Sequence, residues 1–109
     1  MSIVYNWEIG LLNDFYGSLL TKNQSEIISM YYDENLSLGD ISSIKNISRN
    51  AVRDTIVRAT KKLTEFEEKL KLFAKTQNII KMLENLKLSL SDIEVNDIQN
   101  IINYINLYK

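Results

Sequence analysis

The residues best suited to chemistry form a basic cluster in the middle of the chain. All three arginines, Arg49, Arg53 and Arg58, lie close together, and Lys61 and Lys62 follow them. An arginine side chain binds phosphate or carboxylate through two parallel hydrogen bonds and pairs with guanine in the same way. Clustered positive charge is typical of a nucleic-acid contact, and also of a helix face exposed to solvent. The cluster therefore predicts nucleic-acid binding, with a solvated helix face as the alternative.

Helical spacing places most of this cluster on one side of a helix that begins after Ser48. At about 100° per residue, Val52 and Ile56 face the interior, and Arg53 and Lys61 then lie on the outer side. Arg or Lys suits guanine, Asn suits adenine, and backbone N–H groups at the start of a helix hold phosphate. The residues expected to contact nucleic acid are Ser48, Arg49, Asn50, Arg53, Val57, Arg58, Lys61 and Lys62.

The distribution of charge both favours and opposes this hypothesis. Residues 45–62 hold six basic side chains against one acid, a net charge of +5, whereas residues 1–44 hold one lysine against six acids, a net charge of −5. The whole chain has 13 basic and 14 acidic residues, a net charge of −1. Strong DNA-binding proteins are usually basic overall, and the acidic first part repels DNA at low salt. We therefore expect a measurable affinity that is sensitive to salt.

Catalysis is not expected from this composition. The sequence has no Cys and no His, which excludes thiol nucleophiles, Cys/His zinc sites and histidine acid–base chemistry. It also contains no glycine-rich phosphate loop and no paired nucleophile and base. We predict no catalytic residue, no metal site and no cofactor.

No segment of the sequence is expected to cross a membrane. The longest uncharged run covers 11 residues, 98–108, and includes four amide side chains, whereas a spanning helix needs about 20 apolar residues. The first ten residues include no basic residue and do not resemble a signal peptide. We therefore expect a cytoplasmic protein.

The composition favours an all-α fold. There is no proline and there are only three glycines, too few turn-forming residues for a β-rich chain of 109 residues. Hydrophobic periodicity predicts five or six helices in a single domain over residues 1–109. The expected helices cover about 6–20, 22–33, a brief stretch after Ser37, 49–74 and, as two shorter helices, 76–109, with a helix-turn-helix core at about 22–62.

Polar residues mark the expected ends of these helices. Asp40 and Glu94 stand three residues after serines, which is the spacing of a capping box. Asn46 is expected to take the left-handed conformation that turns the chain before the basic helix. The expected N-cap residues are Thr21, Ser37, Ser48 and Ser91.

Apolar residues at helical spacing mark the faces expected to be buried. In the helix over 49–74 these residues repeat every seven positions, which suits packing against other helices of the chain or pairing with a second copy. Ala59, Phe66 and Phe73 fit a tight two-stranded seam poorly, so we favour packing within the chain, and a homodimer remains an alternative. The inward residues of this helix are Val52, Ile56, Ala59, Leu63, Phe66, Leu70 and Phe73. Other inward predictions include Trp7, Leu12, Leu19, Ile27, Ile41, Ile44, Ile79, Leu86, Ile98 and Ile101.

The basic helix and the segment before it resemble a known motif. The stretch from Leu36 to Arg53, continued by Arg58-Ala59 and Lys61-Lys62-Leu63, is similar to the helix-turn-helix of sigma-factor region 4. The resemblance implies that the helix after Ser48 is a recognition helix, which enters the major groove and reads base edges with its first turns.

A wider resemblance covers about residues 7–75. The chain resembles the YlxM-type proteins in Asp14-Phe15-Tyr16, Ser18-Leu19-Leu20-Thr21, Tyr31-Tyr32, Ser48-Arg49 and Glu67-Glu68-Lys69-Leu70. That family usually has glycine at the turn, where this chain has Asn46. It often has tyrosine where this chain has Arg53, which makes this chain better suited to nucleic acid.

The resemblance implies a functional setting as well as a fold. YlxM-type proteins are small bacterial proteins proposed to act in the signal recognition particle (SRP) pathway, because their gene neighbours the GTPase components of the particle. The implied partners are DNA or the SRP RNA, bound through the basic helix of a non-catalytic regulatory protein. The alternative partner is the SRP GTPase or another protein, with the helix-turn-helix used as a scaffold for protein contacts. Residues 76–109 contain no motif through which the resemblance assigns a function.

Overall fold

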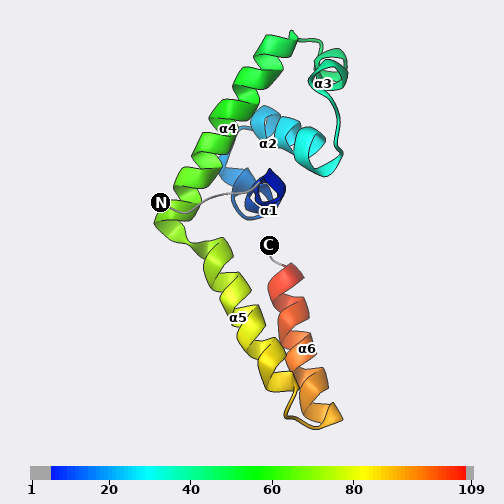
Figure 1. Cartoon of the computed structure of the whole chain (residues 1–109), viewed down its shortest axis with the longest axis vertical. Helices are drawn as coiled ribbons and strands as arrows, with labels where there is room; N and C mark the ends of the chain where they lie inside the picture. The colour runs from blue at the N-terminus through cyan, green and yellow to red at the C-terminus, as the bar shows by residue number, and fades with distance from the viewer. Residues whose placement is uncertain (1–5, 108–109) are drawn as a thin grey trace. The chain divides into compact units, whose positions relative to one another are not determined.

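The computed structural model describes the backbone of residues 6–107 and the side chains of residues 8–107. Six α-helices form this part of the chain: α1 (Asn6–Tyr16), α2 (Lys22–Ile28), α3 (Leu38–Lys45), α4 (Arg49–Leu70), α5 (Leu72–Lys87) and α6 (Asp92–Leu107) (Figure 1). A 3₁₀ turn, Gly17–Leu19, follows α1, and a π-helical turn, Ser29–Asp33, follows α2. The predicted all-α class is confirmed for these residues, and six helices fall within the predicted five or six.

Contacts between residues group the chain into two compact units. The first unit is Met1–Lys71 and the second unit is Leu72–Lys109. In the first unit, α1, α2 and α3 all contact α4, which runs beside them as the longest helix in Figure 1. In the second unit, α5 packs against α6. A single folding domain over residues 1–109 stays a prediction.

The core of the first unit lies where three helices meet α4. The predicted inward residues Val52, Ile56, Ala59 and Leu63 are all buried. Full burial of an aliphatic side chain stabilises a fold by about 1.5–3 kcal/mol, so this stripe is the main attachment of α4 to its unit. The other buried residues of the unit are Ile9, Leu12, Tyr16, Leu20, Ile27, Ile28 and Ile41.

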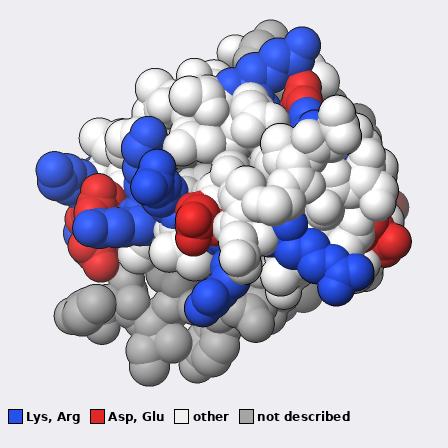
Figure 2. Space-filling model, turned by 90° about the horizontal axis from the view of Figure 1, so that it is seen from above, with Lys and Arg blue, Asp and Glu red and all other residues white. Residues whose placement is uncertain are grey.

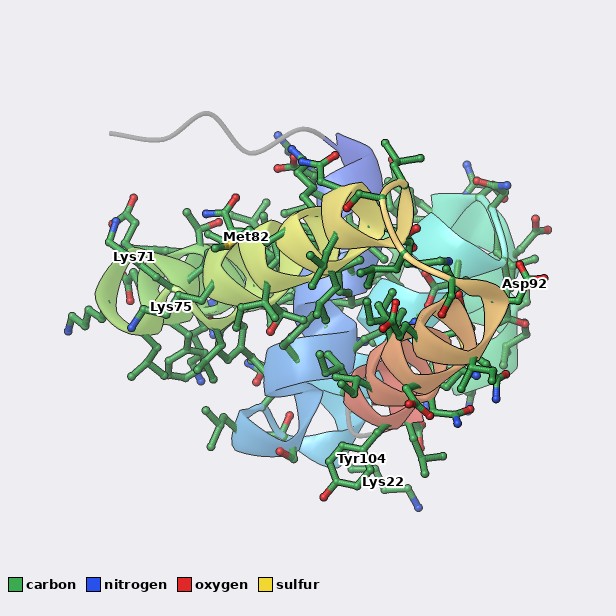
Figure 3. The ribbon with its side chains drawn as sticks, turned by 90° about the horizontal axis from the view of Figure 1, so that it is seen from below. Lys22, Lys71, Lys75, Met82, Asp92 and Tyr104 are labelled. Atoms are coloured by element: carbon green, nitrogen blue, oxygen red, sulfur yellow. The ribbon has the colours of Figure 1, made fainter. Side chains whose placement is uncertain are left out.

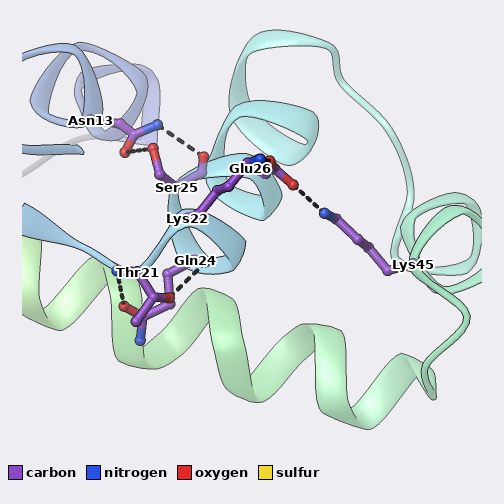
Figure 4. Close-up of polar contacts among 7 residues, drawn as sticks. All are labelled: Asn13, Thr21, Lys22, Gln24, Ser25, Glu26 and Lys45. Atoms are coloured by element: carbon purple, nitrogen blue, oxygen red, sulfur yellow. Dashed lines mark hydrogen bonds and ion pairs between the residues drawn. The ribbon is translucent and has the colours of Figure 1, made fainter. Parts of the chain in front are cut away.

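Two polar contacts help to fix the orientation of the helices that pack in this apolar core. The Asn13 side-chain amide donates to the Ser25 carbonyl oxygen at 3.1 Å, and the Ser25 hydroxyl donates to Asn13 Oδ1 at 3.1 Å, which joins α1 to α2 (Figure 4). The buried Tyr16 hydroxyl donates to Glu67 Oε1 at 2.6 Å, which joins α1 to the last turns of α4. Because hydrogen bonds are directional, these contacts restrict the rotation of each helix about its axis more than apolar contacts alone would.

The predicted N-caps are confirmed. Thr21 accepts a hydrogen bond from the Gln24 N–H at 3.1 Å, and Ser37 accepts one from the Asp40 N–H at 3.0 Å, each within a full capping box. Ser48 accepts from the Ala51 N–H at 3.0 Å. At the start of α6, the Ser91 N–H donates to Glu94 Oε2 at 3.1 Å and the Glu94 N–H lies 3.5 Å from the Ser91 hydroxyl.

Several predicted helix boundaries were wrong. The helix expected over 49–74 ends at Leu70, because Lys71 adopts a left-handed backbone conformation with φ 55°. The next helix therefore begins at Leu72, before the expected position 76. The segment expected as one helix over 6–20 is regular only to Tyr16, where a tighter 3₁₀ turn begins. The segment over 22–33 stays helical but widens into the π-helical turn after Ile28.

Some residues that were predicted to face inward are exposed. The exposed ones are Leu19, Ile44, Leu70, Ile79, Leu86 and Ile101. Leu19 lies in the 3₁₀ turn, and Ile44 and Leu70 lie in the last turns of α3 and α4, so neighbouring helices do not cover them. The other three lie on α5 and α6, which pack against each other in the second unit. The side chain of Trp7 lies outside the described residues.

Candidate nucleic-acid interface

The turn between α3 and α4 is built by short-range contacts. Asn46 has φ 55° and ψ 46°, the predicted left-handed conformation, and its N–H donates to the Ser42 carbonyl oxygen. The Ile47 N–H donates to the same oxygen at 3.2 Å, and the Ser42 hydroxyl donates to the Ile47 carbonyl oxygen at 2.6 Å. Ser48 then caps α4. Ser42 was not predicted from the sequence, and its position four residues before the left-handed Asn46 is the signal that could identify it.

The first half of α4 presents the predicted residues to solvent. Arg49, Asn50, Arg53, Val57 and Arg58 are exposed, as are Ser48, Lys61 and Lys62. Val57, an apolar residue, is 59% exposed, which shows how completely this side faces outward. The neighbouring Thr55 hydroxyl donates to the Ala51 carbonyl oxygen at 2.9 Å and so is occupied locally. All eight candidate residues are thus accessible, and whether they touch nucleic acid stays a prediction.

The basic side chains of this face are not neutralised by acids of the first unit. In the described part of the chain, no carboxylate lies within 4.0 Å of the charged groups of Arg49, Arg53, Arg58, Lys61 or Lys62. Among the basic residues of the segment 45–62, all of them described, only Lys45 pairs with an acid of the first part of the chain, and Lys45 is outside the predicted set. The five charges therefore remain available to an external anion.

Lys45 has a structural partner. Its ammonium group donates to Glu26 Oε2 on α2, and Lys22 lies 3.9 Å from the other oxygen of the same carboxylate (Figure 4). The hydrogen bond from Lys45 holds the pKa of Glu26 below its usual value of 4.5, and Lys22 acts in the same direction. This pair attaches α3 to α2 and involves no residue of the outward face of α4.

Arg49 is placed by a contact that the sequence does not reveal. A Cβ atom added at Gly39 would lie 3.0 Å from Nη2 of Arg49 and 3.3 Å from its Cζ and Nε atoms. The guanidinium group therefore lies beside Gly39 at the start of α3, and the absence of a side chain at Gly39 makes this approach possible.

The start of α2 adds polar groups beside Arg58, along one edge of this face of α4. A hollow of about 400 Å³ is lined by Thr21, Asn23 and Gln24 from this end of α2 and by Ala51, Asp54, Thr55 and Arg58 from α4. A second hollow is lined by Gln24, Arg58, Lys61, Lys62 and Glu65. Arg58 and Gln24 border both. The residues from α2 were not predicted, because their approach to α4 is a tertiary contact.

Figure 2 views the end of the molecule that carries α3 and the first turns of α4. Lys and Arg side chains project from several points on this face, with uncharged surface and a few acidic groups between them. The positive charge is therefore spread over the face rather than gathered in one block. Spread charges suit separate contacts with successive phosphates.

The described residues contain neither a membrane-spanning helix nor a metal site. No helix there is long and apolar enough to cross a membrane. No group of three or more Cys, His, Asp or Glu residues in residues 6–107 has the geometry to hold a metal ion.

Comparison with known proteins places the chain in a family. The family UPF0122, described as "Putative helix-turn-helix protein, YlxM / p13 like", matches residues 3–108. A UPF0122 protein of Desulforamulus reducens is 54% identical over 68 residues, which is 62% of this chain and 58% of the relative, less than two thirds of its length. A UPF0122 protein of Oceanobacillus iheyensis is 45% identical over 89 residues, covering 82% of this chain and 85% of the relative. One from Clostridium perfringens is 41% identical over 85 residues, covering 78% and 76%. With α3, the Asn46 turn and α4 arranged as described, the chain belongs to the UPF0122 family of YlxM- and p13-like helix-turn-helix proteins.

Proposed function

We propose that this protein is a non-catalytic regulatory protein that binds nucleic acid through the outward face of α4. The observation that carries the proposal is the set of five exposed basic side chains that have no acidic partner in the described residues. Such side chains release counterions when they meet phosphates, which provides most of the affinity of a nucleic-acid-binding protein. The helix-turn-helix family supports the same class of function.

The position of each residue along α4 suggests its role. Arg49, Asn50 and Arg53 occupy the first turns, which helix-turn-helix proteins insert into the major groove, where Arg pairs with guanine and Asn with adenine. Val57 lies on the same side and suits contact with a thymine methyl group. Ser48 and the N–H groups of the first turn suit a phosphate oxygen.

The later basic residues suit the phosphate backbone. Arg58, Lys61 and Lys62 lie farther along α4, beside the hollows formed with the start of α2. Asn23 and Gln24 offer additional polar groups there. Contacts of this kind fix the register and orientation of the protein without reading sequence.

We further propose that this activity serves the signal recognition particle pathway in the cytoplasm, with the SRP RNA or DNA as the ligand. The likeness to YlxM-type proteins supports this setting. The alternative is that the same helix-turn-helix is a scaffold that binds the SRP GTPase. Exposed acids of the first unit, among them Asp33, Glu34 and Asp40, favour a basic protein partner in that case.

A salt-dependent binding titration tests the proposal. Fluorescence anisotropy would compare duplex DNA of random sequence with the SRP RNA, for the intact chain and for Arg49→Ala/Arg53→Ala. We expect the double substitution to lower affinity by about 10- to 1,000-fold, since each lost base contact is worth about 1–3 kcal/mol and the effects overlap. The ligand that binds more tightly identifies the setting as transcriptional or particle-associated.

A matched control separates the interface from general charge. Arg53→Ala and Lys69→Ala each remove one positive charge from an exposed position of α4, and only Arg53 lies on the proposed interface. Lys69→Ala is expected to leave affinity nearly unchanged. No binding to either nucleic acid at low salt would overturn the proposal, and the SRP GTPase would then be the partner to test.

A further inference from the structure

The cap of α2 holds the side chain of Gln24 in one orientation. Its Oε1 atom accepts a hydrogen bond from the Thr21 N–H at 3.2 Å, and its backbone N–H donates to Thr21 Oγ1 at 3.1 Å (Figure 4). Because the Thr21 N–H can only donate, the atom that faces it is the amide oxygen of Gln24, and the Nε2 amino group is directed away from this bond. Gln24 therefore has its acceptor engaged in the cap and presents a donor.

This donor is left free at the edge of two hollows. Gln24 is half-buried, and its Nε2 amino group makes no hydrogen bond with the described residues. Polar groups that are partly removed from water usually have a partner. Gln24 lines both hollows beside α4, of about 400 and 450 Å³, and Nε2 is the part of its side chain that the cap does not use.

Arg58 is the other residue that lines both hollows. Its side chain is exposed, and no carboxylate of the described residues lies within 4.0 Å of its guanidinium group. A guanidinium group has five N–H donors and no acceptor. Together with the amino group of Gln24, it offers a set of donors, one of them charged. A phosphate matches this set, because its oxygens are acceptors and carry negative charge.

Two carboxylates restrict where such an anion can lie. Asp54 lines only the first hollow and Glu65 only the second, and each repels an anion that enters its own hollow. The border that the two hollows share is the place where Gln24 and Arg58 can both reach the same group. A phosphate is therefore expected at this border and not deep in either hollow.

We propose that Gln24 and Arg58 together hold one phosphate of the bound nucleic acid. The inference rests on the proposed function and deepens it, because it makes α2 a second element that contacts the ligand. Phosphates are common to DNA and RNA, so the same pair serves either one. A phosphate held between α2 and α4 fixes how α4 is oriented on the nucleic acid.

The substitution Gln24→Glu separates the cap from the phosphate contact. Glutamate keeps the capping box, since its carboxylate accepts from the Thr21 N–H, and an acidic residue suits the first turn of a helix. It also replaces the free amino group by a negatively charged oxygen beside the phosphate. We therefore expect a Tm that is unchanged or raised, measured by circular dichroism. Affinity for duplex DNA and for the SRP RNA should fall by about 10-fold or more in fluorescence anisotropy.

The matched control is Lys22→Gln, which lowers the net charge by one, as Gln24→Glu does. Two residues of a helix turn through about 200°, so Lys22 and Gln24 lie on opposite sides of α2. The Lys22 side chain is 91% exposed, extends into solvent in Figure 3, and lines neither of the two hollows. Salt screens such a distant charge, so we expect Lys22→Gln to change affinity by less than about 2-fold.

NMR of an isotope-labelled chain observes the contact directly. The side-chain amide resonance of Gln24, identified by its absence in Gln24→Glu, is expected to move when nucleic acid is added. That of Gln99, whose amide is bonded to Lys87 and Asn103 within the second unit, is expected to stay in place.

The outcomes distinguish this inference from the proposed function. If the intact chain binds and Lys62→Ala weakens binding, but Gln24→Glu behaves like Lys22→Gln, the inference is overturned and the proposed function stands. A Gln24 amide resonance that does not move in a chain that binds has the same meaning. If the intact chain binds neither DNA nor RNA at low salt, both are overturned.

Discussion

Gly39 leaves room for the guanidinium group of Arg49 on the backbone of α3. Replacing it by alanine brings a Cβ atom to 3.0 Å from Nη2 of Arg49. The far end of an arginine moves easily, and alanine favours a helix over glycine, so we expect Gly39→Ala to raise the free energy of unfolding by about 0.5–1 kcal/mol. Urea denaturation measures this change. Destabilisation would mean that the Arg49 contact holds α3 in place.

The same substitution tests the proposed role of Arg49. If Arg49 contacts nucleic acid from its position on α3, Gly39→Ala changes the affinity of the intact chain by moving the guanidinium group. In a chain that already carries Arg49→Ala, the substitution then has no effect on affinity. A double-mutant cycle compares the two backgrounds, and equal effects in both would argue against this role.

Glu26 gives the first unit a dependence on pH. Its folded pKa lies below the usual 4.5 because Lys45 donates a hydrogen bond to the ionised carboxylate. A lowered folded pKa contributes stability that is fully present above the unfolded pKa and is lost as pH falls through the folded pKa. We therefore expect the intact chain to exceed Glu26→Gln in Tm at pH 7, and the difference to shrink below about pH 4.5 and then vanish.

An exposed carboxylate elsewhere provides the control for this dependence. Glu65 is exposed and makes no ion pair in the described residues, so Glu65→Gln should show no comparable loss of its effect in acid. High salt should also reduce the effect of Glu26→Gln, since the pair is accessible to solvent. If the Tm difference between the intact chain and Glu26→Gln persists at pH 2, the effect comes from packing and not from the ion pair.

At the scale of elements, the turn between α3 and α4 depends on the left-handed Asn46. Asn46→Val places a β-branched residue at φ 55° and is expected to lower the free energy of unfolding by about 1–3 kcal/mol. Asn46→Gly is the matched change, because glycine adopts this conformation without strain, and it is expected to be neutral or slightly stabilising. Chemical denaturation of the three chains decides, and equal stability of Asn46→Val and the intact chain would contradict the prediction.

The helix starts were predictable from sequence because a cap is a local event. At Thr21, Ser37 and Ser48 the hydrogen bond joins residues three positions apart, so short-range spacing is sufficient. The end of α4 was not predictable, since Lys71 takes a left-handed conformation without the glycine or asparagine that usually signals it. The seven-residue apolar repeat continues to Phe73, beyond the end of α4. The repeat reflects only the spacing of apolar side chains, so it does not show where the backbone hydrogen bonds of the helix stop.

The candidate interface likewise has features that the sequence predicts and features that it does not. The exposure of Arg53, Val57 and Lys61 follows from helical periodicity once Val52 and Ile56 are assigned to the core. The approach of Arg49 to Gly39 and of Gln24 to Arg58 depends on how α3 and α2 pack on α4, which no local pattern encodes. Likewise, the helical spacing of Ile79 and Leu86 was recognised in the sequence, but whether these side chains are buried depends on tertiary packing that spacing does not encode.

At the scale of the whole molecule, the balance of charge sets how binding responds to salt. Residues 45–62 carry a net charge of +5 within a chain whose net charge is −1, so attraction to nucleic acid is confined to a few side chains. For duplex DNA the slope of log K against log salt is about −0.9 for each phosphate contact. If Arg58, Lys61 and Lys62 bind phosphates while Arg49 and Arg53 read bases, the slope is about −2.7; if all five bind phosphates, it is about −4.5.

Single substitutions then show which of the five side chains bind phosphates and which read bases. Lys62→Ala should weaken binding to all sequences alike and reduce the slope by about 0.9, whereas Arg53→Ala should leave the slope nearly unchanged and weaken discrimination between sequences. Lys69→Ala, outside the interface on the same helix, should change neither. Because the acidic first part of the chain repels DNA at every sequence, it lowers affinity without altering this division. A slope near zero for the intact chain would mean that the basic face of α4 meets a protein.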